Sequence, residues 1–227
     1  ASCLVGSEMC IRDRFTISSE GVLAFASSPD YETPGSAAAT NAYSVTVTAT
    51  DGGSNTDTTD VTINVGDVND NDPELNVAAT STVSAVENST TVATYSVTDA
   101  DAGDTISYSI SGNDSALFDI DSDGVLTFLS APDFETPGSA AASNAYSVTV
   151  TATDGGNNTD TTDVTINVGD VNDNDPVLTV GDTDTNDVYE GFLPVSTYSV
   201  TDSDAGDTVG WSLSGDDSGL FTISSLG

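Results

Sequence analysis

The octapeptide GDVNDNDP occurs at residues 66–73 and again, letter for letter, at residues 169–176. The two copies stand 103 residues apart, from Gly66 to Gly169, and the same shift lays residues 29–53 on residues 132–156 with few changes. Self-similarity at a fixed period indicates a tandem array of one structural unit. We therefore expect the chain to be a tandem array of repeats that is cut at both ends.

The repeat register sets the expected domain boundaries. Residues 15–73 are the C-terminal part of one repeat, residues 74–176 a complete repeat, and residues 177–227 the N-terminal half of a further one. The first fourteen residues, ASCLVGSEMCIRDR, fall outside the register and contain both cysteines and both arginines of the chain. We interpret residues 1–14 as a non-native, adapter-like leader. A genuine leader or a preceding strand is the alternative.

Apolar and polar residues alternate along the complete repeat, as in AYSVTVTATD, where Tyr146, Val148 and Val150 alternate with serine and threonine. Period-two alternation with β-branched and aromatic residues is typical of half-buried strands. The strands are expected at residues 82–86, 93–98, 106–110, 117–120, 125–129, 145–153 and 161–168. About seven short strands per repeat predict an all-β fold of tandem immunoglobulin-like Greek-key β-sandwiches.

The expected core follows from the inward-facing positions of these strands. It consists of Tyr95, Val97, Ile106, Tyr108, Ile110, Phe118, Ile120, Leu126, Phe128, Tyr146, Val148, Val150, Val164, Ile166 and Val168. Trp211 takes the register position of Tyr108, so we expect it to be a core residue of its repeat.

The charge of the chain excludes several classes of function. From residue 15 onward the chain has no lysine, arginine, histidine or cysteine and carries the whole net charge of −35. Binding to nucleic acid is excluded because phosphates need cationic partners. We predict no enzyme, because a serine nucleophile needs a neighbouring base, although the carboxylates of Asp133 and Glu135 could in principle serve a glycosidase. No apolar run of about 18 residues suggests a transmembrane segment.

The acidic residues cluster in short motifs at expected loops and strand ends. In the complete repeat they are Glu87 in VEN, Asp99 and Asp101 in DAD, Asp133 and Glu135 in DFE, Asp154 in ATDGG, and Asp170, Asn172, Asp173 and Asn174 in DVNDN. Carboxylate and amide oxygens at this density suit Ca²⁺, which takes six to eight oxygen ligands. The absence of histidine and cysteine argues against zinc, copper and iron.

These five motifs, recurring in order at a fixed period, resemble those of cadherin repeats in the form found in large bacterial surface proteins. The resemblance covers the chain from residue 15 onward and implies about three Ca²⁺ ions at each connector. It implies that the first junction uses Asp30, Glu32, Asp67, Asn69, Asp70, Asn71, Asp99, Asp101 and Asp154. It implies that the second uses Glu87, Asp133, Glu135, Asp170, Asn172, Asp173, Asn174, Asp202 and Asp204. The family has an asparagine carbonyl after D-x-D, but AGDT (residues 102–105) stands there instead, so that ligand is left unassigned.

The function that this resemblance implies is calcium-dependent cell-surface adhesion or extension, with Ca²⁺ at the junctions making a tandem array rigid. The partners would be calcium ions, neighbouring repeats, and surface proteins or glycans; whether adhesion is homophilic stays open. An extracellular or cell-surface location is expected, because calcium sites of extracellular modules bind at about 0.1 to 1 mM. The alternative is that these are spacer repeats of a secreted hydrolase or toxin. A carbohydrate-binding sandwich is less favoured, because the one tryptophan occupies a core position.

A second calcium candidate is DIDSDG at residues 119–124, which fits the opening of an EF-hand loop. Its twelfth position is Ser130 instead of glutamate, and strands are expected on both sides. We therefore favour a tight strand-to-strand turn ending in Gly124.

Overall fold

The computed structural model describes residues 14–180, 187–191 and 195–224, so the proposed leader lies outside the described residues except for Arg14. The regular structure of these residues consists of strands and two short 3₁₀ helices, η1 (Ser115–Leu117) and η2 (Ser218–Leu220). The predicted all-β class is confirmed. Among the described residues no helix is long and apolar enough to cross a membrane.

The chain divides into two compact units. The first contains the residues up to Leu75 together with Val97–Ser107 and Ala152–Asp160. The second contains Asn76–Ser96, Tyr108–Thr151 and the residues from Thr161 onward. The residues of each predicted junction fall within a single unit, the first junction in the first unit and the second junction in the second.

Antiparallel pairs make up the first unit. Its strands are β1 (Phe15–Ile17), β2 (Leu23–Phe25), β3 (Ala42–Thr50), β4 (Thr56–Asn64), β5 (Glu74–Leu75) and β8 (Val97–Thr98). β1 pairs with β2, β3 with β4, and β5 with β8. Phe15, Phe25 and Tyr43 pack as an aromatic cluster, with ring centroids of Phe15 and Phe25 4.6 Å apart.

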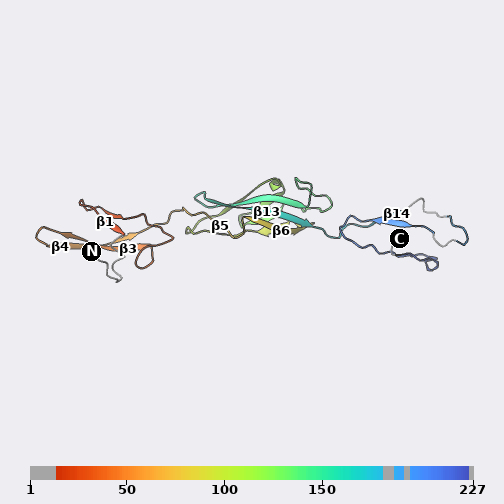
Figure 1. Cartoon of the computed structure of the whole chain (residues 1–227), viewed down its shortest axis with the longest axis horizontal. Helices are drawn as coiled ribbons and strands as arrows, with labels where there is room; N and C mark the ends of the chain where they lie inside the picture. The colour runs from red at the N-terminus through yellow and green to blue at the C-terminus, as the bar shows by residue number, and fades with distance from the viewer. Residues whose placement is uncertain (1–13, 181–186, 192–194, 225–227) are drawn as a thin grey trace. The chain divides into compact units, whose positions relative to one another are not determined.

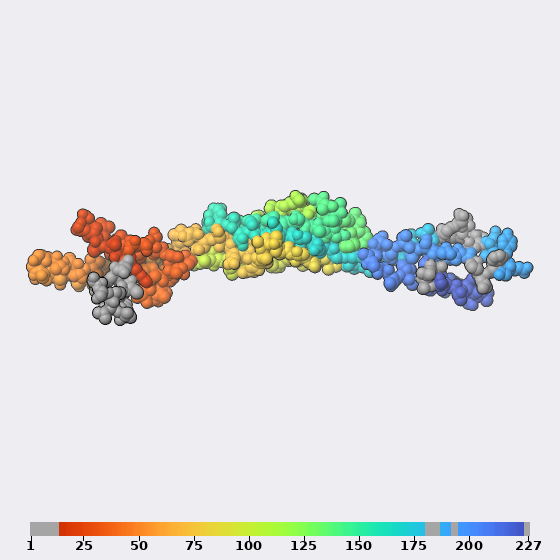
Figure 2. Space-filling model, viewed as in Figure 1, coloured from red at the N-terminus to blue at the C-terminus, as the bar shows by residue number. Residues whose placement is uncertain are grey.

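The sheets of the complete repeat hold the hydrophobic core. Besides β5 and β8, the complete repeat contains β6 (Thr80–Val86), β7 (Thr91–Thr94), β9 (Ser107–Ser111), β10 (Phe118–Ile120), β11 (Val125–Phe128), β12 (Ala145–Thr153) and β13 (Thr159–Gly169). One sheet has the order β6-β13-β12-β9 and another β10-β11-β7. β6 pairs with β13 in parallel, and Figures 1 and 2 show the two segments side by side. A further pair, β14 (Val177–Val180) with β15 (Tyr198–Thr201), follows the repeat.

Most of the predicted core is confirmed as buried. The buried members are Tyr95, Phe118, Leu126, Phe128, Tyr146, Val148, Val150, Val164, Ile166 and Val168. The remaining five, Val97, Ile106, Tyr108, Ile110 and Ile120, are half-buried. Trp211 is also half-buried, as is Tyr108 at the same register position, and it lies outside the strands.

The predicted single strand at residues 93–98 is wrong, because it is divided between two sheets. β7 ends at Thr94 and pairs with β11, whereas β8 begins at Val97 and pairs with β5. The break lies at the buried Tyr95, whose amide donates to the carbonyl of Gly124 at 2.8 Å. This bond extends the β7–β11 register by one residue, and from Ser96, whose carbonyl accepts from the amide of Asn76, the chain pairs on the β5 side.

The tight-turn interpretation of DIDSDG is confirmed. Asp121 Oδ1 accepts hydrogen bonds from the amides of Asp123 and Val125, both at 2.9 Å. Gly124 has a φ of +77°, a backbone conformation that residues with a side chain adopt at a cost. The Asp121 side chain thus shapes a turn between β10 and β11.

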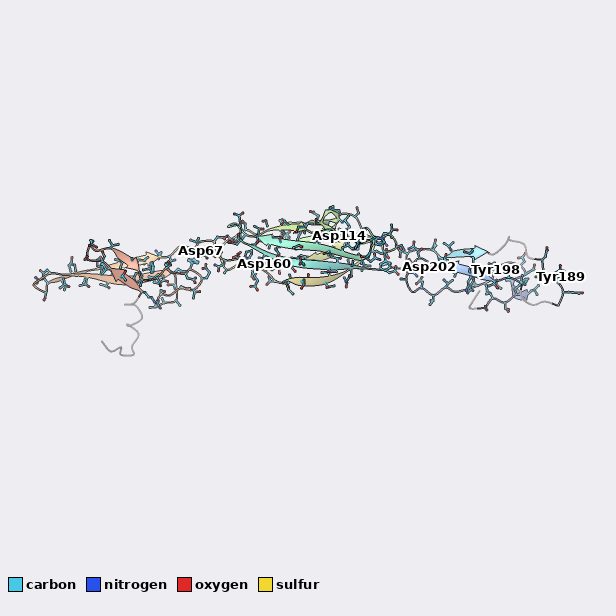
Figure 3. All side chains as sticks on the ribbon, turned by 45° about the horizontal axis from the view of Figure 1, so that its top comes forward. Asp67, Asp114, Asp160, Tyr189, Tyr198 and Asp202 are labelled. Atoms are coloured by element: carbon cyan, nitrogen blue, oxygen red, sulfur yellow. The ribbon has the colours of Figure 1, made fainter. Side chains whose placement is uncertain are left out.

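Asp114 lies between β9 and β10 and is only 4% exposed (Figure 3). Its carboxylate accepts hydrogen bonds from the amides of Ala140, at 2.6 Å, and Ser147, at 2.7 Å. A buried carboxylate is tolerated where backbone amides satisfy its oxygens. Asp114 therefore ties the loop before β12 to β12 itself.

We expect Asp114→Ala to lower the local free energy of unfolding by about 3 kcal/mol, because two part-buried amides lose a charged acceptor. Native-state hydrogen exchange of the β12 amides measures this loss. Asp119→Ala, at an exposed position on β10, is the matched control and should change it little. Equal protection in both variants would contradict the proposed role of Asp114.

Candidate metal sites at the two junctions

The first junction brings carboxylates from distant parts of the sequence together. Glu32, Asp70 and Asp101 each offer an oxygen within 4.8 Å of the others. A second group, formed by Asp99, Asp104 and Asp154, meets the same limit. Asp101 is 5% exposed and Asp154 6% exposed, so both are removed from solvent.

The linker of the first junction, residues 66–73, is bound to the loop after β8. Asn71 donates to Asp101 twice, from its amide at 2.9 Å and from Nδ2 at 2.8 Å. Asp67, marked in Figure 3, accepts a hydrogen bond from the amide of Ala102 at 2.8 Å. These bonds hold linker oxygens beside the DAD motif.

Asn158 completes the polar lining of the first junction, a role that sequence reasoning missed. Its Nδ2 donates to Asn69 Oδ1 at 2.8 Å, to the Asn71 carbonyl at 3.1 Å, and to Asp154 Oδ2 at 2.8 Å. A Cβ on Gly156 would overlap Asn69 Oδ1. The glycine in DGGNN therefore permits the close approach of the linker.

The second junction repeats this arrangement around the linker at residues 169–176. Its carboxylate groups are Glu87–Glu135–Asp173, Glu135–Asp170–Asp204 and Asp202–Asp204–Asp207. Glu87 is 3% exposed and accepts hydrogen bonds from the amides of Val171, at 2.6 Å, and Phe134, at 2.8 Å. Asn174 donates twice to Asp204, as Asn71 does to Asp101.

Two predicted ligands outside the linkers do not join these groups. Asp30 accepts from the amide of Thr33 at 3.0 Å, and Asp133 from that of Thr136 at 2.8 Å. Each aspartate thus closes a local turn, and neither belongs to a three-carboxylate group among the described residues. A side chain that satisfies a neighbouring amide three residues away is fixed by its own turn.

The sequence reasoning also missed Asp104 and Asp207, which do join the groups. The signal was present, because both stand at the same place in DAGDT, one in each repeat. Asn88 was missed as well, and its Nδ2 donates to Asp173 Oδ2.

Several carboxylate oxygens at the junctions are buried and have no hydrogen-bond partner. They are Glu32 Oε1, Asp67 Oδ1, Asp99 Oδ2, Glu135 Oε1 and Asp170 Oδ1. Glu32 and Glu135 are related by the repeat, as are Asp67 and Asp170, and the same atom is left without a partner in each pair. Buried charged oxygens are costly unless a cation or a donor meets them. The repeats contain no basic side chain, so these residues fit a hard metal ion such as Ca²⁺.

The pKa values of these groups reflect their crowding. Burial raises the pKa of Glu135, and the nearby Glu87 and Asp170 carboxylates raise it further. Burial likewise raises the pKa of Asp104, with added repulsion from Asp154 and Asp99. In both groups, burial and the repulsion between carboxylates disfavour the simultaneous ionisation of neighbouring carboxyl groups. A divalent cation would reverse that effect.

Comparisons with known proteins agree with the fold and the motifs. The Cadherin domain family matches residues 81–169. The chain is 36% identical over 184 residues to the protocadherin-like wing polarity protein stan of Drosophila melanogaster, a match that covers 74% of this chain and 5% of that protein. It is 38% identical over 146 residues to human protocadherin Fat 4, covering 60% of this chain and 3% of that protein. The chain therefore spans only a small part of the length of these relatives.

The structure is similar to solved cadherin domains. The extracellular domain of protocadherin GammaB4 superimposes with a TM-score of 0.63 at 27% identity, covering 85% of this chain and 31% of that chain. The predicted immunoglobulin-like sandwich class is thereby confirmed, since this neighbour consists of such repeats. On the repeated acidic motifs, the sandwich and these matches, the chain belongs to the cadherin family.

Proposed function

We propose that this chain is a calcium-dependent module of a cell-surface protein, in which Ca²⁺ bound at the inter-repeat junctions holds successive repeats together for adhesion or extension. The observation that carries the proposal is the set of buried, unpartnered carboxylate oxygens that recurs at both linkers. A tandem array with no basic side chain from residue 15 onward cannot neutralise these oxygens itself. A divalent ion with many oxygen ligands can.

The ligands at the first junction would be Glu32, Asp67, Asn69, Asp70, Asn71, Asp99, Asp101 and Asp154. At the second they would be Glu87, Glu135, Asp170, Asn172, Asp173, Asn174, Asp202 and Asp204. Asp30 and Asp133 each accept a turn amide through Oδ1, and Oδ2 of each carboxylate would serve as the ligand atom. Bound Ca²⁺ would supply positive charge and cross-link the linker to loops on either side of it, with about three ions at each complete junction.

The repeat boundaries at residues 73 and 176 belong to the same proposal, since each junction would end one repeat and begin the next. Calcium sites of extracellular modules fill at about 0.1 to 1 mM, which supports a location outside the cell for this module. The protocadherin relatives favour adhesion over the spacer function of a secreted hydrolase or toxin.

The test compares the chain in EDTA, in millimolar Ca²⁺ and in millimolar Mg²⁺. We expect Ca²⁺ to raise the melting temperature and to protect both linkers from proteolysis. At a concentration about ten times Kd, three ions bound only by the folded junction add about 4 kcal/mol by mass action. Mg²⁺ should do much less, because it requires a tight octahedral site. Identical melting and cleavage in EDTA and Ca²⁺ would overturn the proposal.

A further inference from the structure

The segment DAGDT follows β8 and recurs after β15, with Asp104 in the first copy and Asp207 in the second. In the cadherin pattern a neutral backbone carbonyl is expected shortly after D-x-D, and here that position has no assigned ligand. A carboxylate is a different kind of ligand, because it brings a full negative charge.

The geometry puts Asp104 among the proposed ligands of one ion. It offers an oxygen within 4.8 Å of oxygens on Asp99 and Asp154. Asn69 in the linker donates its Nδ2 to Asp104 Oδ2, so the side chain faces the junction. Asp99 Oδ2, in the same group, is buried and has no hydrogen-bond partner.

The second junction shows a similar arrangement. Asp207 groups with Asp202 and Asp204, and Asn172 donates its Nδ2 to Asp207 Oδ2. The two loops therefore present a carboxylate to their linkers in the same way. Recurrence at both junctions is difficult to reconcile with an incidental surface aspartate.

We propose that the Asp104 carboxylate is itself a Ca²⁺ ligand at the first junction, in the place of a backbone carbonyl, and that Asp207 has this role at the second. The inference rests on the proposed function, since it assigns one ligand of the same site. An additional anionic ligand strengthens attraction for the ion and, without the ion, adds repulsion. The loop thus makes the junction more dependent on Ca²⁺ than one closed by a carbonyl.

A purely structural role of Asp104 would give a different result in melting experiments. If Asp104 served only to hold Asn69, the asparagine side chain that Asp104→Asn introduces could still accept that hydrogen bond. The variant would then melt like the parent in both conditions. If Asp104 is a ligand, the variant should respond with opposite signs in EDTA and in Ca²⁺.

The experiment measures melting temperature and Ca²⁺ binding by calorimetry for the whole chain, for Asp104→Asn, and for the control Asp119→Asn. Asp119 is exposed on β10 and outside every carboxylate group of the described residues, so its substitution removes the same charge elsewhere. We expect Asp104→Asn to melt higher than the parent in EDTA and lower in Ca²⁺. The Ca²⁺ affinity of the first junction should fall by about tenfold or more, as expected for losing an anionic ligand.

Each outcome bears on a separate claim. If the parent binds no Ca²⁺, the proposed function fails. If the parent binds Ca²⁺ and Asp104→Asn binds it with unchanged affinity, the ligand assignment fails while the function stands. An equal loss of melting temperature in EDTA and in Ca²⁺ would also overturn the assignment, because it would identify Asp104 as a residue needed for folding.

Discussion

Gly124→Ala is expected to destabilise the complete repeat more than any other single substitution considered for this chain, by about 3 to 5 kcal/mol. A Cβ at this position would overlap the carbonyl oxygen of Tyr95 and stand 3.0 Å from Cζ of Tyr108. The first contact is with backbone, which cannot rotate away. Alanine at this position would also have to adopt a φ of +77°, which is unfavourable for a residue with a side chain.

The repeat supplies a matched control for Gly124→Ala. Gly21 occupies the same register position, has a φ of +83°, and has no atom within 4 Å of its ideal Cβ. Gly21→Ala should therefore cost only the backbone strain, about 1 to 2 kcal/mol. Hydrogen exchange of the strands flanking each turn measures both losses. Similar losses would mean that contact with Tyr95 and Tyr108 contributes nothing.

Asp173→Ala is expected to produce the largest loss of calcium response at the second junction. Asp173 groups with Glu87 and Glu135 and accepts a hydrogen bond from Asn174 Nδ2 at 2.9 Å. Its removal deletes an anionic ligand and leaves neighbouring carboxylates less compensated. We expect Ca²⁺ affinity at this junction to fall by about thirtyfold or more, which corresponds to about 2 kcal/mol.

The control is Asp175→Ala, two residues further along the same linker. Asp175 is exposed and lies outside the carboxylate groups of the described residues. Limited proteolysis of residues 169–176 across a Ca²⁺ titration reads out both variants. Protection of the parent and of Asp175→Ala, with cleavage of Asp173→Ala, is the expected result. Equal protection of all three would show that Asp173 does not bind the ion, and global unfolding of Asp173→Ala would identify it as a determinant of the fold.

The fold was predictable from the sequence where one face of a strand meets the core. β12 was predicted with its bounds, because tyrosine, valine and alanine alternate along it without interruption. β7 and β8 were merged into one strand, because nothing in TYSVT marks the change of sheet at Tyr95. Up to Tyr95 the chain pairs with the β11 side and from Ser96 with the β5 side, and pairing between residues so far apart in sequence is not encoded locally.

The residues of the candidate site were predictable from the sequence mainly where their acidic motifs recur from one repeat to the next. Asp101 was found because its D-x-D motif recurs, and Glu87 because it fits the early glutamate of the family pattern, and the structure places both buried residues in carboxylate groups. Asp104 recurs equally, but its segment departed from the family pattern and was left unassigned. Asp30 and Asp133 stay predictions, and a pattern of letters does not reveal that each side chain is also bonded to an amide in its own turn.

The parallel pairing of β6 with β13 has a mechanical consequence. Seven consecutive residues of each strand are paired, from Asp163 opposite Thr80 to Gly169 opposite Val86. In a stretched tandem array, tension would pass through the short β5–β8 pair to the start of β6 and leave at the end of β13, pulling the paired strands β6 and β13 past each other along their length. The evenly spaced bonds of this parallel ladder slant across that direction, so all of them must shear together before the repeat opens. Rupture would then be governed by the rate of crossing that barrier and not by equilibrium stability, and a variant that weakens the β6–β13 ladder should fail at lower force even when its melting temperature is unchanged.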